Sequence, residues 1–390
     1  MTGVGKWGRR CELCSMRIGM VCYPTFGGSG VVATELGKAL AAKGHEIHFI
    51  TYDQPARLGS FQTHIFYHEV RVSDYPLFDY PPYELVLASK LVEVARNRSL
   101  DLVHVHYAIP HASAAYMARE ILAKEGVKLP VVTTLHGTDI TLLGRDPSFE
   151  PVISFAINQS DVVTAVSQSL RSDTFKLFGV NREIEVVPNF YCASHFQITP
   201  NEEFRKAIAP NGEPILTHIS NFRPVKRISD VVELFRQVRE SLPAKLLMVG
   251  DGPDRAAAEQ RITEWGLQGD VVFLGKVKNP VEALMISDLF LLPSESESFG
   301  LAALEAMAAG VPVIGSNAGG MPEVIRHGVS GLLSDVGSTR DLARNAIYLL
   351  ESKERMAQFS QQAKERALEF RIDRVMPKYE ALYNKALRRD

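Results

Sequence analysis

The sequence predicts an α/β protein in which two Rossmann-like, doubly wound domains face a central cleft. Short apolar runs alternate with longer segments of helical period almost from end to end, a pattern typical of parallel sheets with crossover helices. A polar stretch from about Asn189 to Gly212 interrupts this alternation once. The chain has 390 residues, 46% of them hydrophobic, which is enough to build two cores.

The expected strands fall into two sets, one on each side of the polar stretch. In the first half they are Arg17–Tyr23, Glu46–Thr51, Leu102–His106, Val131–Leu135, Val162–Val166 and Ile184–Val187. In the second half they are Ile215–Ile219, Lys245–Val249, Val271–Leu274, Leu289–Leu292, Val313–Gly315 and Gly331–Leu333. Helical patterns separate most of them. The charged, helical segment from Ser352 to Arg389 is too long for one more crossover, so we expect it to pack back across the domain junction.

These patterns divide the chain into four parts. We expect residues 1–15 to form a disordered leader, residues 16–195 the N-terminal domain and residues 196–370 the C-terminal domain. Residues 371–390 should form a helix that packs back on the N-terminal domain. Cys11 and Cys14 form a CxxC pair in the leader, but no second pair completes a zinc site, so a disordered extension is favoured over a metal or redox function.

Charge and hydropathy narrow the functional classes. Lys and Arg number 43 against 45 Asp and Glu, a balance that argues against a nucleic-acid-binding protein. No apolar run approaches the roughly 18 residues that span a bilayer, and the N-terminus lacks the apolar core of a secretory signal. We therefore expect a cytoplasmic protein without stable membrane association. The oligomeric state stays open, and a homo-oligomer is one possibility.

The segment SESESFGLAALE, from Ser294 to Glu305, contains the most informative pattern. It sets a loop carboxylate, Glu297, eight residues before a helical carboxylate, Glu305. Ser298 is expected to cap the helix between them, which leaves unpaired backbone N–H groups at Phe299, Gly300 and Leu301. Such a helix start binds phosphate, and the flanking carboxylates suit sugar hydroxyls. Because a buried strand, DLFLLP, precedes the loop, the segment predicts a nucleotide-sugar site at the carboxyl edge of a sheet.

A second anion site is expected in the first loop, YPTFGGSGVVATELGKAL. Glycines at 27, 28 and 30 let the backbone approach a ligand, and a helix is expected from Val31 onward. The segment Gly28–Ala33 also matches the dinucleotide fingerprint, with Asp53 placed as a ribose-binding acid. Four residues, Pro24 to Gly27, separate the strand from the fingerprint, whereas the dinucleotide turn is tight. An NAD-dependent oxidoreductase and a purely structural glycine loop remain alternatives.

Histidines follow two strands that should be neighbours. His136 opens the sequence HGTD after the strand VVTTL, so its imidazole should lie on the cleft-facing edge of the N-terminal domain. The segment HVHYAIPH holds His104 and His106, which alternate onto one strand face, and His111 beyond a proline. We interpret His104 and His106 as mainly structural, with metal binding by the cluster as the alternative.

The sequence NFRPVKR, Asn221 to Arg227, places Arg223, Lys226 and Arg227 after the first strand of the second domain. A solvated surface charge run is the simplest explanation. Its position at a strand end that faces the Glu297 loop favours diphosphate binding instead, because arginine and lysine both bind phosphate. VGDGP, Val249 to Pro253, is expected to shape the cleft wall. The chain has no D-x-D triplet, so we expect catalysis without a metal ion or another cofactor.

Together these motifs resemble the retaining glycosyltransferases of the GT-B fold that share an E-x7-E element. The resemblance covers the glycine-rich first loop, HGTD, NFRPVKR, VGDGP, ESFGLAALEAMAAGVPVIGSNAGGMPE and the C-terminal helix, nearly the whole chain after Met16. More narrowly, CYPTFGGSGVVATELG, FDYPPYELVLASK, VHVHYAIPHA and TTLHGTDIT are similar to the members that glycosylate malate in bacillithiol biosynthesis. In this family the N-terminal domain selects the acceptor and the C-terminal domain holds the nucleotide.

The resemblance implies transfer of N-acetylglucosamine from UDP-N-acetylglucosamine to the hydroxyl of L-malate, with retention of the anomer. It implies that Glu305 binds the ribose and Glu297 the donor sugar. The β-phosphate would be held by Arg223 and Lys226, helped by the backbone N–H groups of Phe299, Gly300, Leu301 and the Gly28 loop. His136 would contact the sugar near O6. Malate would be bound by Ser29, Tyr107, Thr134 and Asn189, although the sequence PNFYCASHF departs from the family pattern there.

The departing diphosphate needs fixed positive partners more than the reaction needs a strong nucleophile, and Arg223, Lys226 and the helix start supply them. No carboxylate is obviously placed for a double displacement. We therefore favour a same-face mechanism in which the leaving phosphate accepts the proton of the malate hydroxyl. The alternatives are a GT-B glycosyltransferase with a lipid or polysaccharide acceptor and the NAD-dependent oxidoreductase considered above.

Overall fold

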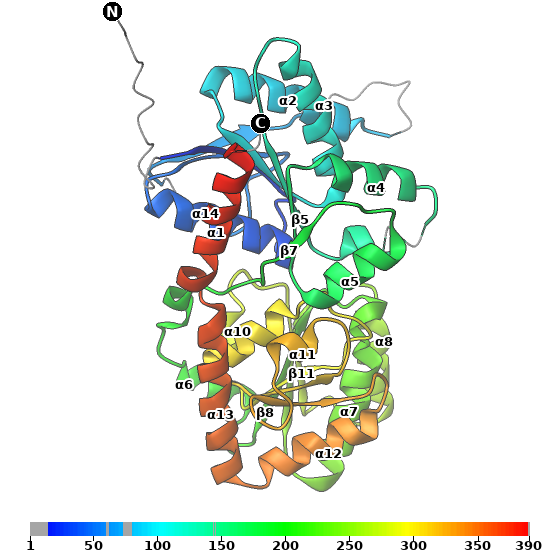
Figure 1. Ribbon diagram of the computed structural model, residues 1–390. Helices are drawn as coiled ribbons and strands as arrows, with labels where there is room; N and C mark the ends of the chain where they lie inside the picture. The colour runs from blue at the N-terminus through cyan, green and yellow to red at the C-terminus, as the bar shows by residue number, and fades with distance from the viewer. Residues whose placement is uncertain (1–14, 60–61, 73–79, 143, 145, 389–390) are drawn as a thin grey trace, which may run out of the picture.

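The computed structural model describes residues 15–59, 62–72, 80–142, 144 and 146–388. It contains two α/β units, each built on a parallel sheet, and they stack end to end (Figure 1). The leader with the CxxC pair lies outside the described residues, apart from Ser15. In the described part of the chain, no helix is both long and apolar enough to cross a membrane.

The N-terminal sheet has seven strands in the order β3-β2-β1-β4-β5-β6-β7. Its strands are β1 Arg17–Val21, β2 Glu46–Thr51, β3 Ile65–Glu69, β4 Leu102–His106, β5 Val131–Leu135, β6 Val162–Ala165 and β7 Ile184–Val186. Its helices are α1 Gly28–Ala42, α2 Tyr83–Arg98, α3 Ser113–Ala123, α4 Glu150–Gln159 and α5 Gln168–Leu177. The strand order reverses at β1, which pairs with β2 on one side and β4 on the other. Loops that follow β1 and β4 therefore diverge around a ligand-binding position.

The C-terminal sheet has six strands in the order β10-β9-β8-β11-β12-β13. They are β8 Ile215–Ser220, β9 Lys245–Gly250, β10 Val271–Gly275, β11 Leu289–Leu292, β12 Val313–Ser316 and β13 Gly331–Ser334. The surrounding helices are α6 Glu202–Ile208, α7 Ile228–Ser241, α8 Arg255–Glu264, α9 Val281–Met285, α10 Leu301–Ala309, α11 Met321–Val324 and α12 Thr339–Leu350. Here the order reverses between β8 and β11, so the loops after these two strands lie together.

The predicted strands are all present, with ends within two residues of those expected. One strand, β3, was missed. Its residues, IFYHE, alternate poorly in hydrophobicity and are mostly half-exposed, as befits an edge strand. The fold class read from the sequence is therefore confirmed by the two parallel sheets.

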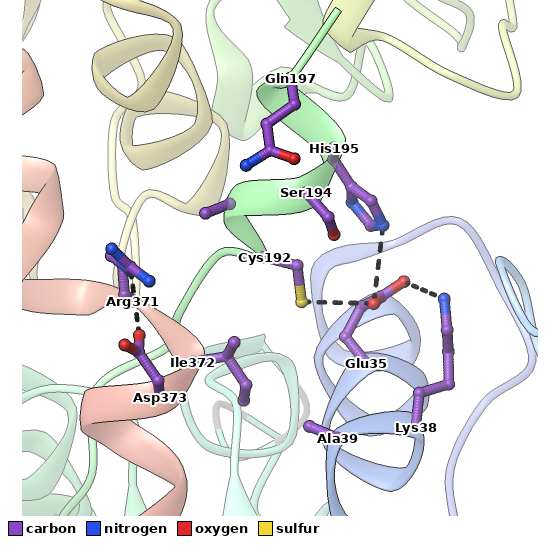
Figure 2. A pocket seen from close by; sticks show the side chains of 11 residues that line it. Glu35, Lys38, Ala39, Cys192, Ser194, His195, Gln197, Arg371, Ile372 and Asp373 are labelled. Carbon is purple, nitrogen blue, oxygen red and sulfur yellow. Dashed lines mark hydrogen bonds and ion pairs between the residues drawn. The ribbon is translucent and has the colours of Figure 1, made fainter. Parts of the chain in front are cut away.

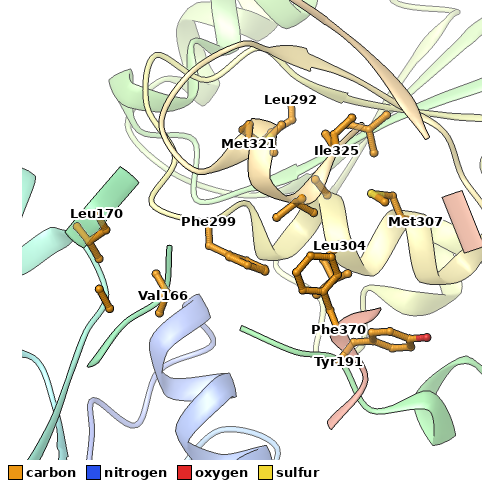
Figure 3. Packing of buried hydrophobic residues seen from close by; sticks show 14 of the residues in the cluster. Val166, Leu170, Tyr191, Leu292, Phe299, Leu304, Met307, Met321, Ile325 and Phe370 are labelled. Carbon is orange, nitrogen blue, oxygen red and sulfur yellow. The ribbon is translucent and has the colours of Figure 1, made fainter. Parts of the chain in front are cut away.

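The end of the chain joins the two units. Helix α13, Lys353–Ala367, runs along the C-terminal unit, and α14, Ile372–Arg388, continues along the N-terminal one (Figure 1). Tyr379 and Tyr383 of α14 are fully buried in the same core cluster as α1 and β1. A second cluster spans both units: Val166 and Leu170 of the N-terminal unit pack in it with Phe299 and Phe370 (Figure 3). The two units are thus joined by continuous apolar contacts.

Candidate active site

The start of α1 lies against the start of α10. A Cβ atom built on Gly28 would lie 3.7 Å from Cδ2 of Leu301, the first residue of α10. Helix α1 begins at Gly28, earlier than the expected Val31. A Cβ on Gly30 would come within 2.4 Å of the Thr25 carbonyl oxygen, so only glycine allows this tight entry into the helix. Two helix N-termini, both favourable to anions, therefore meet at the domain junction.

The start of α10 differs from the prediction in its cap. Ser298 does not cap the helix; the N-cap is Gly300, whose φ of 93° is accessible mainly to glycine, and no side chain caps it. Ser298 instead packs against Gly137, where an added Cβ would lie 1.7 Å from its Oγ, and its carbonyl accepts a hydrogen bond from Ser167 at 2.5 Å. Ser298 therefore contacts the N-terminal domain instead of capping α10.

The expected phosphate-binding N–H groups are nevertheless placed as predicted at the helix start. Among the described residues, none accepts a hydrogen bond from the backbone N–H of Phe299, Gly300 or Leu301. The Phe299 side chain is buried in the cluster that spans both units. Its backbone is therefore fixed while its N–H stays available.

Glu297 is paired with one of the predicted phosphate-binding cations. Its Oε1 accepts hydrogen bonds from Lys226 Nζ at 2.6 Å and from Ser294 Oγ at 2.8 Å. The backbone of Glu297 is held from the other side by Gly320, whose N–H donates to the Glu297 carbonyl at 2.7 Å. Arg223 is exposed at the start of the turn that holds Lys226, and no described residue pairs with its guanidinium. The structure thus brings Lys226 and Glu297 together and leaves Arg223 free.

The neighbouring turn supports this cationic loop. A Cβ on Gly250 would lie 1.8 Å from the carbonyl oxygen of Ser220, and one on Gly252 would lie 2.1 Å from that of Asn221. VGDGP therefore packs directly against the backbone of NFRPVKR. Arg227 Nε donates a hydrogen bond to Asp230 Oδ2 at 2.6 Å in the first turn of α7. This contact of Arg227 is therefore structural and lies within its own domain.

Glu305 meets a residue that the sequence analysis did not single out. Its Oε1 lies 3.2 Å from Nη1 of Arg57, in the loop after β2, and the two side chains are 12% and 16% exposed. Burial raises the pKa of Glu305, and the Arg57 guanidinium counteracts that rise. The two residues are 248 positions apart, so no local pattern could pair them.

The histidines form a connected, neutral cluster. His106 Nδ1 lies 2.7 Å from His136 Nε2, while His104 contacts Tyr383 Oη at 2.8 Å and Thr134 Oγ1 at 2.7 Å. Burial lowers the pKa of both His104 and His136 to about 3. His104 and His106 do share one strand face, as predicted. Within the described residues, no three His, Cys, Asp or Glu side chains form a metal-binding group.

Of the predicted acceptor contacts, Ser29 and Tyr107 meet directly. The Tyr107 hydroxyl donates to Ser29 Oγ at 2.8 Å, and burial raises the pKa of this phenol. Tyr107 has a φ of 91°, a strained conformation for a non-glycine residue at the end of β4. Such strain is often found at functional sites.

The other two predicted acceptor contacts are placed differently. The Thr134 side chain is fully buried, and its hydroxyl bonds to His104 and to Thr164 at 2.7 Å each. Its strand position turns it toward α14, and its contact with the acceptor stays a prediction. Asn189 is 6% exposed, and its buried Oδ1 has no hydrogen-bond partner, so it retains an unused acceptor atom.

Asp139 is a further site residue that the sequence analysis missed. Its carboxylate accepts hydrogen bonds from the N–H groups of Ala108 and Gly137, both at 3.0 Å, and so ties the loops after β4 and β5 together. Burial raises its pKa to about 6, against the effect of these backbone hydrogen bonds. The final residue of the HGTD motif was the available signal. Asp139 fixes the loop that presents His136.

A polar network lies beside the junction. Glu35 on α1 bonds to Lys38 at 3.1 Å and to Cys192 Sγ at 3.3 Å, and His195 lies 3.7 Å from the same carboxylate. These residues line an open cavity of about 440 Å³ that extends to Arg371 (Figure 2). Cys192 and His195 belong to PNFYCASHF, the segment that departs from the family pattern.

Comparison with known proteins assigns the class. Residues 26–193 match the model of Glycosyltransferase Family 4, and residues 200–366 match that of Glycosyl transferases group 1. Anabaena HepE, solved in complex with UDP and glucose, has the same fold, with a TM-score of 0.78 at 22% identity over 95% of this chain and 99% of that one. Sucrose-phosphate synthase from Thermosynechococcus elongatus gives a TM-score of 0.77 at 20% identity, over 95% and 98% of the two chains. The fold is that of a GT-B glycosyltransferase.

By sequence, the chain is 49% identical over 377 residues to the N-acetyl-alpha-D-glucosaminyl L-malate synthase of Bacillus anthracis; the match covers 96% of this chain and 98% of that protein. It is also 28% identical over 337 residues to an uncharacterised glycosyltransferase of Methanocaldococcus jannaschii, covering 81% and 84% of the two chains. The chain therefore belongs to the glycosyltransferases that combine a Glycosyltransferase Family 4 domain with a Glycosyl transferases group 1 domain, as its motifs predicted.

Proposed function

We propose that this enzyme transfers N-acetylglucosamine from UDP-N-acetylglucosamine to the hydroxyl of L-malate, with retention of the anomer, as the first step of bacillithiol biosynthesis. The observation that supports it most is the 49% identity to an N-acetyl-alpha-D-glucosaminyl L-malate synthase over 96% of the chain. The identity extends through the N-terminal half, where Ser29 and Tyr107 meet.

The donor would be held mainly by the C-terminal domain. Glu305 would accept the ribose hydroxyls and Glu297 those of the sugar, while Lys226, Arg223 and the start of α10 would bind the diphosphate. Lys226 Nζ is already held by Glu297 Oε1 at 2.6 Å, so it need not reorganise when charge grows on the leaving group. His136, kept neutral by burial, would meet the sugar near O6 as a hydrogen-bonding rather than a charged group.

The acceptor would be held mainly by the N-terminal domain. Malate carries two carboxylates, and the start of α1 at Gly28 with Ser29 suits one of them. Tyr107, at hydrogen-bonding distance from Ser29, would bind beside it. The unpaired Oδ1 of Asn189 is an acceptor, so it suits the malate hydroxyl rather than a carboxylate.

The chemistry would follow a same-face path. The bond from the anomeric carbon to the β-phosphate oxygen breaks, and a bond from that carbon to the malate oxygen forms on the same face. The proton of the malate hydroxyl passes to the leaving phosphate, which gives UDP and the sugar–malate product. Lys226 and Ser294 both bind Oε1 of Glu297, which supports a binding role for this carboxylate.

The test is to incubate the purified protein with UDP-N-acetylglucosamine and a panel of hydroxy acids, and to measure UDP release and product mass. We expect a sugar–malate product, with lactate a far poorer acceptor because it lacks one carboxylate. Efficient use of lactate would refute the malate assignment but leave glycosyl transfer intact. The reaction should also continue in EDTA; loss of activity that magnesium or manganese restores would refute a metal-free mechanism.

A further inference from the structure

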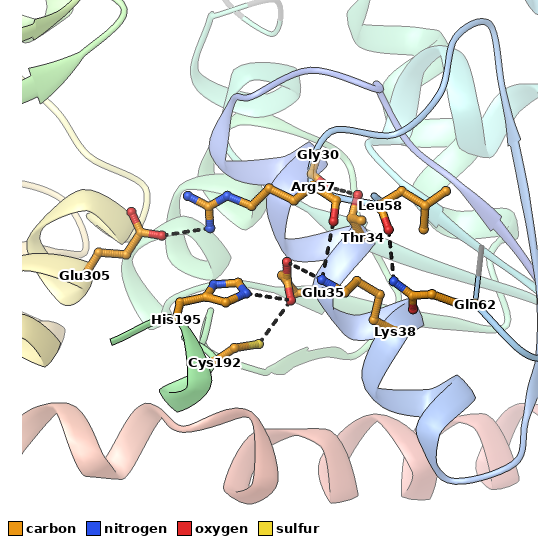
Figure 4. A network of polar contacts seen from close by, with 10 residues as sticks. All are labelled: Gly30, Thr34, Glu35, Lys38, Arg57, Leu58, Gln62, Cys192, His195 and Glu305. Atoms are coloured by element: carbon orange, nitrogen blue, oxygen red, sulfur yellow. Dashed lines mark hydrogen bonds and ion pairs between the residues drawn. The ribbon is translucent and has the colours of Figure 1, made fainter. Parts of the chain in front are cut away.

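Arg57 crosses from the N-terminal domain to the carboxylate expected to bind the donor ribose. It follows β2, yet its Nη1 lies 3.2 Å from Oε1 of Glu305 on α10 (Figure 4). The pair is largely shielded from solvent, at 16% and 12% exposure. Because screening by water weakens exposed pairs, this burial makes the contact energetically significant.

The backbone of Arg57 is held in an unfavourable conformation. Its φ of 63° lies in the left-handed region, which is uncommon for a residue other than glycine. Lys38 Nζ donates to the Arg57 carbonyl at 3.3 Å, and Lys38 is in turn paired with Glu35 at 3.1 Å (Figure 4). The network beside α1 therefore fixes the point from which the guanidinium reaches across the cleft.

Arg57 favours the charged form of Glu305. Burial raises its pKa, as does the nearby carboxylate of Glu35, whereas Arg57 opposes both effects. Cys192 and His195, from the segment that links the domains, line the same small cavity as Arg57 and Glu305. Arg57 contacts only Oε1; among the described residues, none donates a hydrogen bond to Glu305 Oε2.

We propose that Arg57 is a positioning residue for the nucleotide: it holds Glu305 with one carboxylate oxygen engaged and the other directed to the ribose hydroxyls. The inference rests on the proposed function, in which Glu305 binds ribose. Its consequence is that donor recognition by the C-terminal domain depends on a side chain from the acceptor-binding domain. Arg57 and Glu305 line a cavity of about 10 Å³.

The experiment is calorimetric titration of the full chain with UDP at pH 7.5 and pH 6, using wild type, Arg57→Gln, Arg57→Lys and Glu305→Gln. Arg344→Gln is the control, because the pair of Arg344 with Asp341 on α12 is exposed and is its sole ion pair among the described residues. We expect Arg57→Gln to weaken UDP binding roughly tenfold at pH 7.5 and more at pH 6 relative to wild type, because loss of the cation favours protonation of the buried Glu305 carboxylate. Lysine should restore most of the affinity, and the control should match wild type.

The double variant separates positioning from general damage. If Arg57 acts through Glu305, Arg57→Gln should cause no further loss in the Glu305→Gln background. Unchanged UDP binding by Arg57→Gln would overturn the inference. Tighter UDP binding would overturn it too, because it would mean that Arg57 only blocks the Glu305 carboxylate from the nucleotide. An equal loss in both backgrounds would overturn it too. Failure of the wild type to bind UDP would instead refute the proposed function itself.

Discussion

Replacement of Lys226 by Met should reduce turnover far more than it reduces UDP binding. Methionine keeps most of the apolar stem but removes the ammonium, which lies 2.6 Å from Glu297 Oε1. In the proposed reaction that ammonium faces a diphosphate whose negative charge grows in the transition state. Loss of one preorganised donor to such a charge typically costs about 2.7–4 kcal/mol, or a factor of roughly 10²–10³ in kcat.

Two features of the structure set the size of the remaining effects. The Lys226 and Glu297 side chains are 20% and 12% exposed, so their pair is largely shielded from solvent. In Lys226→Met the Glu297 carboxylate would keep the hydrogen bond from Ser294 but lose the ammonium, and the free energy of unfolding should fall by about 1 kcal/mol. The substrate itself partly compensates in the ground state, because Arg223 and the start of α10 still face the diphosphate. UDP affinity should therefore weaken less than tenfold.

The assay is steady-state kinetics with UDP-N-acetylglucosamine and malate, alongside UDP calorimetry and thermal unfolding of each variant. Glu297→Gln is the matched control, since it removes the pair but leaves the ammonium in place. If Lys226→Met lowered kcat/KM and UDP affinity by equal factors, Lys226 would be a simple binding group. A kcat close to wild type would refute the charge-stabilising role altogether.

Three other outcomes can be measured. Tyr107→Phe should raise the KM for malate about tenfold or more, since it removes the hydroxyl bonded to Ser29, with UDP affinity near wild type by calorimetry; an effect on the donor alone would contradict this. Gly300→Ala should lower the free energy of unfolding, measured in urea, by at least about 1–2 kcal/mol, because Gly300 has a φ of 93° and the new Cβ would lie 2.6 Å from Met321 Sδ. Unchanged stability and UDP affinity would show that the turn is not constrained. Burial lowers the pKa of His104 to about 3, so the neutral imidazole contributes its full stability above about pH 6.5 and that stability is lost as the pH falls. Between pH 7.5 and 5 the free energy of unfolding of the wild type should fall by about 2 kcal/mol more than that of His104→Asn. Equal losses would contradict the buried neutral state.

The sequence by itself determined the two sheets and the edges at which ligands bind. Buried parallel strands are near-continuous runs of Val, Ile and Leu, so their ends can be located without tertiary information. Once the strands are placed, motifs that follow them must gather at the carboxyl edges, which is why Glu297 and Lys226 were expected together and are 2.6 Å apart. The edge strand β3 was not predicted, because its residues are partly exposed and do not form an apolar run.

Tertiary structure decided the contacts that cross between distant segments. Thr134 looks available at a strand end, but α14 covers that face and the hydroxyl bonds to His104 and Thr164. Ser298 has the side chain of a helix cap, but Gly137 from the other domain packs against it and Gly300 makes the turn. The pairing of Arg57 with Glu305 depends on how the two domains dock. Local propensity cannot encode such choices, because each is set by the packing of surfaces that are brought together only when the chain folds.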